Sequence, residues 1–243
     1  MADAPLAALW VYLAASPLLW LSLTLGCYLI ALRIYRLGGE SPLLNPVAIA
    51  VSLLIGLLVF TGTPYQTYFD GAQFVHFLLG PATVSLAIPL YRQRERLRSL
   101  ALPIVAALLA SVLAAASSAV GLGLLLGAGT ETLISLAPKS VTAPVAMGIS
   151  EKLGGLPSLT AVLVVSTGIL GAVVGTGLFR LLRIRDDAVK GFALGATSHG
   201  IGTARAFQVS PVMGAFAGLA MALSAFVTAL LLPPLLRWIG LVG

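Results

Sequence analysis

The chain has 243 residues, of which 59% are hydrophobic and only 9% are charged, and its mean hydropathy is +1.05. This composition excludes an ordinary water-soluble domain and indicates a membrane protein in contact with lipid. The formal net charge is +6, but the cations form short clusters beside apolar segments, where they contact anionic headgroups, and we therefore expect no nucleic-acid partner.

Five segments approach the roughly 20-residue length that an α-helix needs to cross a bilayer. In chain order they are residues 17–32, 46–60, 101–126, 159–182 and 212–236. None of them alternates apolar with polar residues, as the strands of a membrane barrel do. The predicted fold class is therefore all-α, a polytopic bundle of membrane helices that forms one integral membrane domain over residues 1–243.

Three clusters of cations predict how these spans are oriented, because cytoplasmic loops are enriched in Lys and Arg. The clusters are Arg33 and Arg36; Arg92, Arg94, Arg96 and Arg98; and Arg180, Arg183, Arg185 and Lys190. Between the second and third clusters lie two long spans and a shorter segment at 130–153, and only an even number of crossings returns the chain to the cytoplasm. The shorter segment is therefore predicted to dip in from outside as a re-entrant or broken helix, bent near Pro138 and again near Pro144.

Two parts of the chain resemble each other at an offset of about 115 residues. The stretch at 77–83 resembles that at 192–197, and the spans on either side match at a similar shift. The cation clusters place the two copies in opposite membrane orientations, which is the pattern of inverted repeats in secondary transporters. We therefore expect one repeat at about 45–127 and a second at about 157–238.

Two polar stretches, residues 139–144 and 195–205, interrupt the apolar sequence and form the candidate functional site. Ionisable groups at that depth are costly and usually mark the path of a ligand or ion. A helix that begins inside the membrane also exposes free N–H groups and the positive end of its dipole, both of which bind anions. Such helix breaks are predicted at Gly80 and Pro81, at Pro138 and Pro144, and at Gly200 and Gly202.

The side chains near these breaks each have two interpretations. Hydroxyl groups either cap free N–H groups or bind the oxygen atoms of a ligand. Lys139 either neutralises a carboxylate in a wet cavity or extends to the membrane surface. Arg205 either binds a carboxylate through its planar guanidinium or is an interfacial arginine. His199 either makes a structural hydrogen bond or carries a proton, since its ordinary pKa permits titration.

Motifs of enzymes and metal proteins are not found in the sequence. It has no Gly-x-Ser-x-Gly elbow, no His-Glu-x-x-His pair and no phosphate-cradling loop that ends in Gly-Lys. His76 is the only histidine besides His199, and Cys27 is the only cysteine. We therefore expect no enzymatic activity, no metal and no cofactor, although a catalytic dyad assembled between distant segments stays open.

Four stretches, residues 79–84, 138–149, 156–161 and 196–206, resemble signature sequences of the LrgB/CidB family of membrane proteins. The resemblance implies a multi-pass protein of the bacterial inner membrane. It also implies two competing functions. Bacterial members are described as holin/antiholin-like regulators of murein hydrolase activity and cell lysis, which act with a small LrgA/CidA-type membrane partner. Other relatives transport small monocarboxylates such as glycolate, glycerate or pyruvate.

Of these two functions we favour transport, because a holin needs helices that assemble into a hole, whereas inverted repeats and broken helices with cations suit alternating access by an elevator or rocking motion. We expect a homo-oligomer whose substrate is a small carboxylate anion, with the two cations compensating its charge. Lysis regulation with the small partner is the alternative. The predicted substrate-binding residues are Thr83, Lys139, Ser140, Thr142, Ser198, His199, Thr203 and Arg205.

Overall fold

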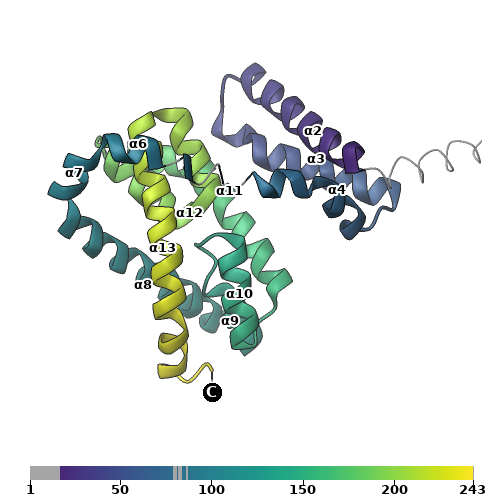
Figure 1. Cartoon of the computed structure of the whole chain (residues 1–243). Coiled ribbons are helices and arrows are strands. Elements are labelled where there is room, and N and C mark those ends of the chain that lie inside the picture. The colour runs from purple at the N-terminus through teal and green to yellow at the C-terminus, as the bar shows by residue number, and fades with distance from the viewer. Residues whose placement is uncertain (1–16, 79–80, 82–83, 86, 243) are drawn as a thin grey trace, which may run out of the picture. The chain divides into compact units, whose positions relative to one another are not determined.

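The computed structural model describes residues 17–242 except 79–80, 82–83 and 86 (Figure 1). These described residues form helices and connecting turns, without strands. The predicted break residue Gly80 and the predicted site residue Thr83 lie outside the described part. The chain divides into two compact units, Met1–Ser85 and Leu86–Gly243, a boundary that the sequence does not reveal.

Among the described residues, five helical segments are long and apolar enough to cross a membrane. They are Leu18–Leu37, Pro42–Thr61, Ala101–Leu125, Pro157–Leu181 and Pro211–Trp238. Each coincides with one of the five spans predicted from hydrophobicity, which is a local property of the chain. The all-α polytopic fold class is therefore confirmed, and the protein is a multi-pass membrane protein.

The described residues of the first unit form a pair of long helices and a shorter third helix. They are α2 (Pro17–Leu37), the single turn η1 (Pro42–Leu44), α3 (Pro46–Thr61) and α4 (Tyr65–Phe77). Asn45 starts α3, because its side-chain oxygen accepts hydrogen bonds from the backbone N–H groups of Val47 (2.9 Å) and Ala48 (3.1 Å). The buried Trp20 of α2 meets Tyr68 of α4 edge to face at 5.9 Å, so an aromatic contact joins these two helices.

The second unit carries the remaining helices and both polar stretches. They are α6 (Ala87–Arg92), α7 (Arg94–Ser99), α8 (Ala101–Leu125), α9 (Thr130–Leu136), α10 (Ala143–Leu153), α11 (Pro157–Leu181), α12 (Asp187–Val209) and α13 (Pro211–Trp238). The three long helices α8, α11 and α13 form its frame.

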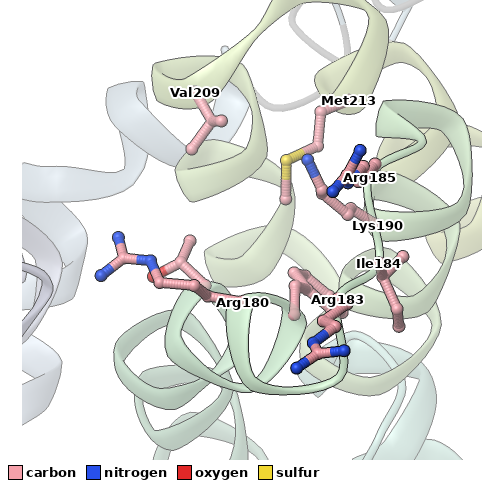
Figure 2. Close-up of a pocket in the computed structure, with 9 residues that line it drawn as sticks. Arg180, Arg183, Ile184, Arg185, Lys190, Val209 and Met213 are labelled. Atoms are coloured by element: carbon pink, nitrogen blue, oxygen red, sulfur yellow. The ribbon is translucent and has the colours of Figure 1, made fainter.

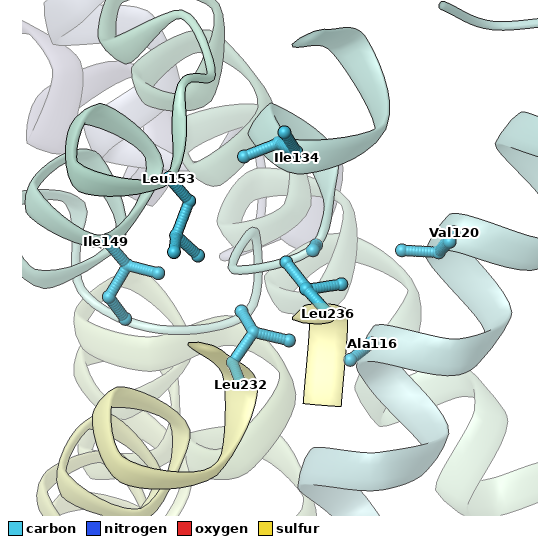
Figure 3. Packing of buried hydrophobic residues seen from close by; sticks show 8 residues of the cluster. Ala116, Val120, Ile134, Ile149, Leu153, Leu232 and Leu236 are labelled. Carbon is cyan, nitrogen blue, oxygen red and sulfur yellow. The ribbon is translucent and has the colours of Figure 1, made fainter. Parts of the chain in front are cut away.

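Helices α8 and α13 run parallel to each other. Near the start of α8, Leu108 packs in one buried cluster with Ala220 of α13. Further along, Val120 packs in a second cluster with Leu236, where the two helices also enclose side chains of α9 and α10 (Figure 3). Residue numbers thus rise together along both helices.

Helix α11 runs antiparallel to α13. Phe179, near the end of α11, clusters with Ala217 near the start of α13. Val164, in the first half of α11, packs instead in a cluster that includes Ala225. The end of α11 therefore lies beside the start of α13.

Helices α9 and α10 form a hairpin, named here the first hairpin (130–153). With 7 and 11 residues they are only about 10 and 17 Å long, too short to cross a hydrocarbon core of about 30 Å. The chain leaves helical geometry between Leu136 and Ala143, in the region of Pro138 and Pro144 where the sequence predicts a bend. The two helices lie side by side, because Ser135 of α9 contacts Gly155, just beyond α10.

A network of hydroxyl groups fixes the first hairpin to the start of α11. Thr160 Oγ1 lies 2.8 Å from Ser150 Oγ and 3.1 Å from the carbonyl oxygen of Ser135. The backbone N–H of Leu156 donates to Ser135 Oγ over 2.7 Å. These side chains are buried, so the network satisfies polar groups that have no access to water.

Helix α12 is also a hairpin, named here the second hairpin (187–209). The hydroxyl of Ser210 donates to Asp187 Oδ2 over 2.8 Å, so the two ends of α12 meet. A continuous helix of 23 residues would hold these ends about 34 Å apart. The chain reverses at His199, whose backbone angles are φ 41° and ψ −130°.

Glycines of the second hairpin serve close packing rather than the reversal itself. The sequence predicts a break at Gly200 and Gly202, whereas the structure places it at His199 and leaves both glycines helical. A Cβ atom on Gly202 would lie 2.6 Å from the carbonyl oxygen of Leu194 on the opposite limb. Gly202 therefore lets the two limbs approach closely.

Each hairpin precedes a long helix, and the two pairs have opposite orientations. The first hairpin begins beside the end of α8 and precedes α11, whereas the second begins beside the end of α11 and precedes α13. Because α11 and α13 are antiparallel, the hairpins enter the unit from opposite ends. This inverted pair lies within 130–238. The repeat predicted at 45–127 and 157–238 spans both units and stays a prediction.

Candidate functional site

The tips of the two hairpins share one cavity of about 420 Å³. Four segments line it, although they are far apart in the sequence. The lining residues are Lys139 and Ser140 of the first hairpin, Thr197 and Ser198 of the second hairpin, Ser111, Ala114, Ala115 and Ser118 of α8, and Thr167 and Gly171 of α11. The two polar stretches that interrupt the apolar sequence thus come together in space.

The cavity lies halfway along the helices that line it. Residues 111–118 occupy the middle of α8, and 167–171 occupy the middle of α11, each helix having 25 residues. A helix of that length spans the whole hydrocarbon core. Polar side chains at this depth need a partner or a wet cavity, so their position indicates a functional site.

Lys139 brings a positive charge to the cavity without a compensating carboxylate. Its ammonium group lies 3.4 Å from the hydroxyl oxygen of the adjacent Ser140, a long hydrogen bond. Among the residues that the structure describes, no acidic side chain forms an ion pair with Lys139. A half-buried cation in these surroundings favours the binding of an anion.

Ser198 anchors the tip of the second hairpin on α11. Its side chain is fully buried, and it contacts Gly171 so closely that any Cβ atom there would overlap its hydroxyl oxygen. The exposed neighbour Thr197 lines the cavity, and its hydroxyl donates to the carbonyl oxygen of Ala193 over 2.8 Å. Ser198 thus both lines the cavity and packs against α11.

His199 holds the tip in place through a hydrogen bond to α11. Its Nε2 atom lies 2.9 Å from the carbonyl oxygen of Val164, and because a carbonyl only accepts, Nε2 carries the hydrogen and donates it. Gly168 faces the imidazole ring, where a Cβ atom would come within 2.7 Å of Cε1. Thr203 in turn donates to the carbonyl oxygen of His199 over 2.8 Å. This geometry supports the structural interpretation of His199.

Four predicted site residues of the described chain lie outside the cavity lining, namely His199, whose contacts are given above, and Arg205, Thr142 and Thr203. Arg205 is on the return limb of the second hairpin, where its guanidinium donates to Gln208 Oε1 over 3.1 Å. Thr142 precedes α10 as its N-cap residue, without a side-chain capping bond. Thr203 is buried and bonded to the hairpin reversal. The structure therefore does not bring Arg205 to Lys139 in this cavity, because the reversal at His199 carries the arginine back along the hairpin.

The sequence analysis missed the cavity residues that α8 and α11 contribute. Ser111 and Ser118 are seven positions apart in α8, with Ala114 and Ala115 between them, so they share one face of the helix. Thr167 and Gly171, four positions apart, share a face of α11 in the same way. Small and hydroxyl-bearing residues at helical spacing are the signal that identifies these faces.

Comparison with known proteins assigns the chain to a family. The model of the LrgB-like family matches residues 24–238, which include both hairpins and the cavity. The chain belongs to the LrgB-like family. The predicted resemblance is therefore confirmed, and all four cavity-lining segments lie within the LrgB-like match.

Individual relatives within this LrgB-like group cover nearly the whole chain. The protein is 36% identical over 218 residues to YwbG of Bacillus subtilis (strain 168). The aligned region covers 90% of this chain and 96% of YwbG. It is 32% identical over 219 residues to the holin-like protein CidB of Staphylococcus aureus (strain Mu50). That alignment covers 90% of this chain and 95% of CidB. No solved structure matches the chain.

Proposed function

We propose that the protein carries a small carboxylate anion across the membrane by alternating access. The observation that supports this proposal most directly is the position of Lys139, an ammonium group without a carboxylate partner in the described residues, in a cavity where two hairpin tips meet. A monocarboxylate with two or three carbons is the substrate class that we propose, because one negative charge compensates one ammonium group.

The lining of the cavity suits the other atoms of such a substrate. Hydroxyl groups of Ser111, Ser118, Thr167 and Thr197 are available from three different segments. The hydroxyls of Ser111, Ser118 and Thr197 donate to backbone carbonyl oxygens of their own helices, so their oxygen atoms can accept from a 2-hydroxy group. They donate to a carboxylate only when they rotate away from those carbonyls. A volume of about 420 Å³ leaves room for the anion together with water molecules.

The arrangement of the hairpins supports a carrier rather than an open pore. Each tip forms part of the cavity wall, and the hairpins enter from opposite ends of the unit. Displacement of one hairpin therefore opens the cavity to one side while the other hairpin still closes the opposite side. Broken helices around a site at half depth are the usual architecture of secondary transporters.

A second candidate function is regulation of lysis as a holin-like protein. The names of the staphylococcal CidB relatives support this function more directly than they support transport. In that role the protein acts with a small membrane partner of the LrgA/CidA type and assembles into oligomers. A holin-like assembly passes large solutes, whereas a carrier passes only solutes that fit its cavity.

Proteoliposomes distinguish the two functions. Vesicles with the purified protein, alone and with the small partner, are tested for uptake of labelled glycolate, glycerate and pyruvate and for release of a trapped dextran. The proposal predicts saturable uptake of at least one acid, retention of the dextran and loss of uptake in Lys139→Ala. Lys152→Ala is the matched control, because Lys152 lies on the same hairpin but is exposed at the end of α10. Release of dextran together with the acids contradicts the carrier and supports the holin-like function.

A further inference from the structure

A second large cavity lies at the base of the second hairpin, away from the hairpin tips (Figure 2). It has a volume of about 610 Å³, and we name it the basal pocket. Its walls come from the end of α11, from both limbs of the second hairpin and from the start of α13. The lining residues are Thr176, Phe179, Arg180, Arg183, Ile184, Arg185, Lys190, Val209 and Met213.

The basal pocket has an excess of positive charge. Four of its nine lining residues are cations, and none is acidic. The two nearest carboxylates in the sequence are already engaged. Asp186 pairs with Arg96 over 2.6 Å, and Asp187 accepts from Lys190 and Ser210. Within the described residues, the three arginines of the pocket therefore have no acidic partner.

Arg183 occupies a backbone position that normally favours glycine. It follows the end of α11 in the left-handed region, with φ 56°, and the N–H of Ile184 closes the helix end by donating to the carbonyl oxygen of Phe179 over 2.9 Å. Elsewhere in the described chain a positive φ occurs at Glu40, at His199 and at five glycines, Gly39, Gly62, Gly127, Gly154 and Gly240. A side chain is strained there, because in the left-handed conformation its Cβ atom comes close to the following carbonyl oxygen.

This strain argues that the guanidinium of Arg183 has a purpose beyond membrane orientation. Orientation needs a cation near the end of the span but not at this particular residue. The neighbouring C-cap residue of α11, at position 182, has φ −79°, so an arginine there would serve orientation without a left-handed backbone. Retaining Arg183 instead places a third guanidinium at the rim of the same pocket.

The charged ends of these side chains are turned in different directions around the pocket. In Figure 2 the guanidinium groups of Arg180 and Arg183 point away from each other, while Arg185 and Lys190 lie on the opposite wall. Like charges adopt such positions to reduce repulsion. An anion with several oxygen atoms would bridge them, since each guanidinium can bind two oxygens at once.

We propose that the basal pocket binds a phosphate-bearing anion at the cytoplasmic surface and thereby fixes the second hairpin to the end of α11. A phosphate group fits better than the monocarboxylate substrate, because its higher charge and extra oxygens match several cations. The source is either the headgroup of an anionic phospholipid or a soluble phosphate compound. The pocket lies at the end of a membrane span, where both are accessible.

Two binding measurements on the purified full-length protein test this proposal and separate the sources. In the first, the melting temperature in neutral detergent is followed during titration with sodium phosphate and, at matched ionic strength, with sodium chloride. In the second, native mass spectrometry compares retention of phosphatidylglycerol with that of phosphatidylcholine. Binding raises the melting temperature only for a ligand of the folded state.

Four variants make the test specific to the pocket. In Arg183→Gly the backbone strain is relieved, so we expect a melting temperature without ligand at or above that of the parent. The guanidinium is lost, so we expect the affinity for the phosphate-bearing ligand to be at least about tenfold weaker. Arg185→Gln is expected to weaken binding similarly. Glu40→Gly is the backbone control, because Glu40 also has a left-handed φ of 57°, and Arg98→Gln is the charge control on the exposed surface of α7.

The outcomes are distinct. A response to phosphatidylglycerol alone identifies a lipid headgroup, and a response to phosphate alone identifies a soluble ligand. Either response supports the proposal if Arg183→Gly and Arg185→Gln lose it while Glu40→Gly and Arg98→Gln keep it. Absence of both responses overturns the proposal. Parent-like affinity in Arg183→Gly and Arg185→Gln also overturns it, as does an equal loss in Arg98→Gln. The result is independent of transport, because neither measurement requires uptake.

Discussion

The hydroxyl of Ser210 lies 2.8 Å from Oδ2 of Asp187, and this contact closes the base of the second hairpin. Lys190 donates to the other carboxylate oxygen of Asp187 over 2.9 Å. Because the two ends of α12 meet, α12 is a hairpin and not a bent helix that spans the membrane. The contact at its base therefore helps to hold the tip of the second hairpin in the cavity.

The Asp187 contact predicts a pH-dependent contribution to stability. Hydrogen bonds from Lys190 and then from Ser210 lower the pKa of the Asp187 carboxyl below its ordinary value of 3.8. The stabilisation is therefore complete above pH 3.8 and is lost as the pH falls through the lowered pKa. Asp187→Asn should reduce the melting temperature at pH 7, by no more than the equivalent of about 1 kcal/mol because the site is partly exposed.

The same melting experiment at a pH below the lowered pKa provides the check. There the parent and Asp187→Asn should melt at nearly the same temperature, because the parent carboxyl is then protonated. Glu151→Gln is the control, since Glu151 is exposed on the first hairpin. A difference between parent and Asp187→Asn that persists unchanged into acid would refute the electrostatic explanation.

Gly195 should not tolerate even one additional methyl group. A Cβ atom there would overlap the backbone carbonyl of Ala217, which cannot move without shifting α13. We expect Gly195→Ala to destabilise the protein by about 1–3 kcal/mol. Gly200→Ala is the matched control, because Gly200 is helical and exposed and only Met221 Sδ comes near, at 3.9 Å. It should be neutral or slightly stabilising in thermal unfolding, whereas equal damage from both substitutions would contradict this packing.

His199 should be replaced better by glycine than by alanine. Both substitutions remove the hydrogen bond to Val164, but only glycine adopts φ 41° and ψ −130° without strain. We expect His199→Gly to melt above His199→Ala by the equivalent of about 1 kcal/mol. Equal melting temperatures would show that the reversal has moved away from residue 199.

Ser118 should control access to the cavity without controlling stability. Its side chain is exposed and lines the cavity, whereas that of Ser117 is exposed on a different face of α8. If the proposed carboxylate binds in this cavity, Ser118→Leu reduces carboxylate uptake at least about tenfold while the melting temperature stays unchanged, since a leucine fills the space of the proposed substrate. Ser117→Leu should retain parent uptake, and a similar loss in both would rule out a specific steric effect.

The two half-buried cations of the sequence analysis should differ in importance. Lys139 lines the cavity, whereas Arg205 bonds to Gln208 on the return limb and does not. Lys139→Ala should lower uptake at least about tenfold, the effect of one charge-assisted hydrogen bond, and Arg205→Ala less than about threefold. A larger loss in Arg205→Ala would restore the prediction that both cations bind the carboxylate.

The sequence predicts those parts of the fold that depend on local properties. The five spans follow from length and hydrophobicity, and the bend near Pro138 follows from a residue that cannot continue a helix. The second hairpin does not follow, because its evidence is the contact between Asp187 and Ser210, which are 23 positions apart. From the glycine content the reversal is predicted around Gly200 to Gly202, whereas the non-helical residue is the adjacent His199, and Gly202 serves the close approach of the two limbs.

The sequence likewise predicts only part of the candidate site, because local polarity can be read from the sequence whereas contacts between distant segments cannot. The sequence identifies Lys139, Ser140 and Ser198 because they are polar in apolar surroundings. It includes Arg205 for the same reason, although the reversal six residues earlier carries that side chain away from the cavity. Polarity alone therefore finds the stretches but cannot tell which face of a broken helix meets its counterpart.

Direct binding of a labelled monocarboxylate to the purified protein tests the central claim, that Lys139 at the meeting point of the two hairpins binds the substrate anion. Scintillation proximity with glycolate, glycerate and pyruvate should show saturable binding of at least one acid to the parent and to Lys152→Ala, and loss of that binding in a folded Lys139→Ala variant. Binding of equal affinity in the parent and in Lys139→Ala would contradict the claim.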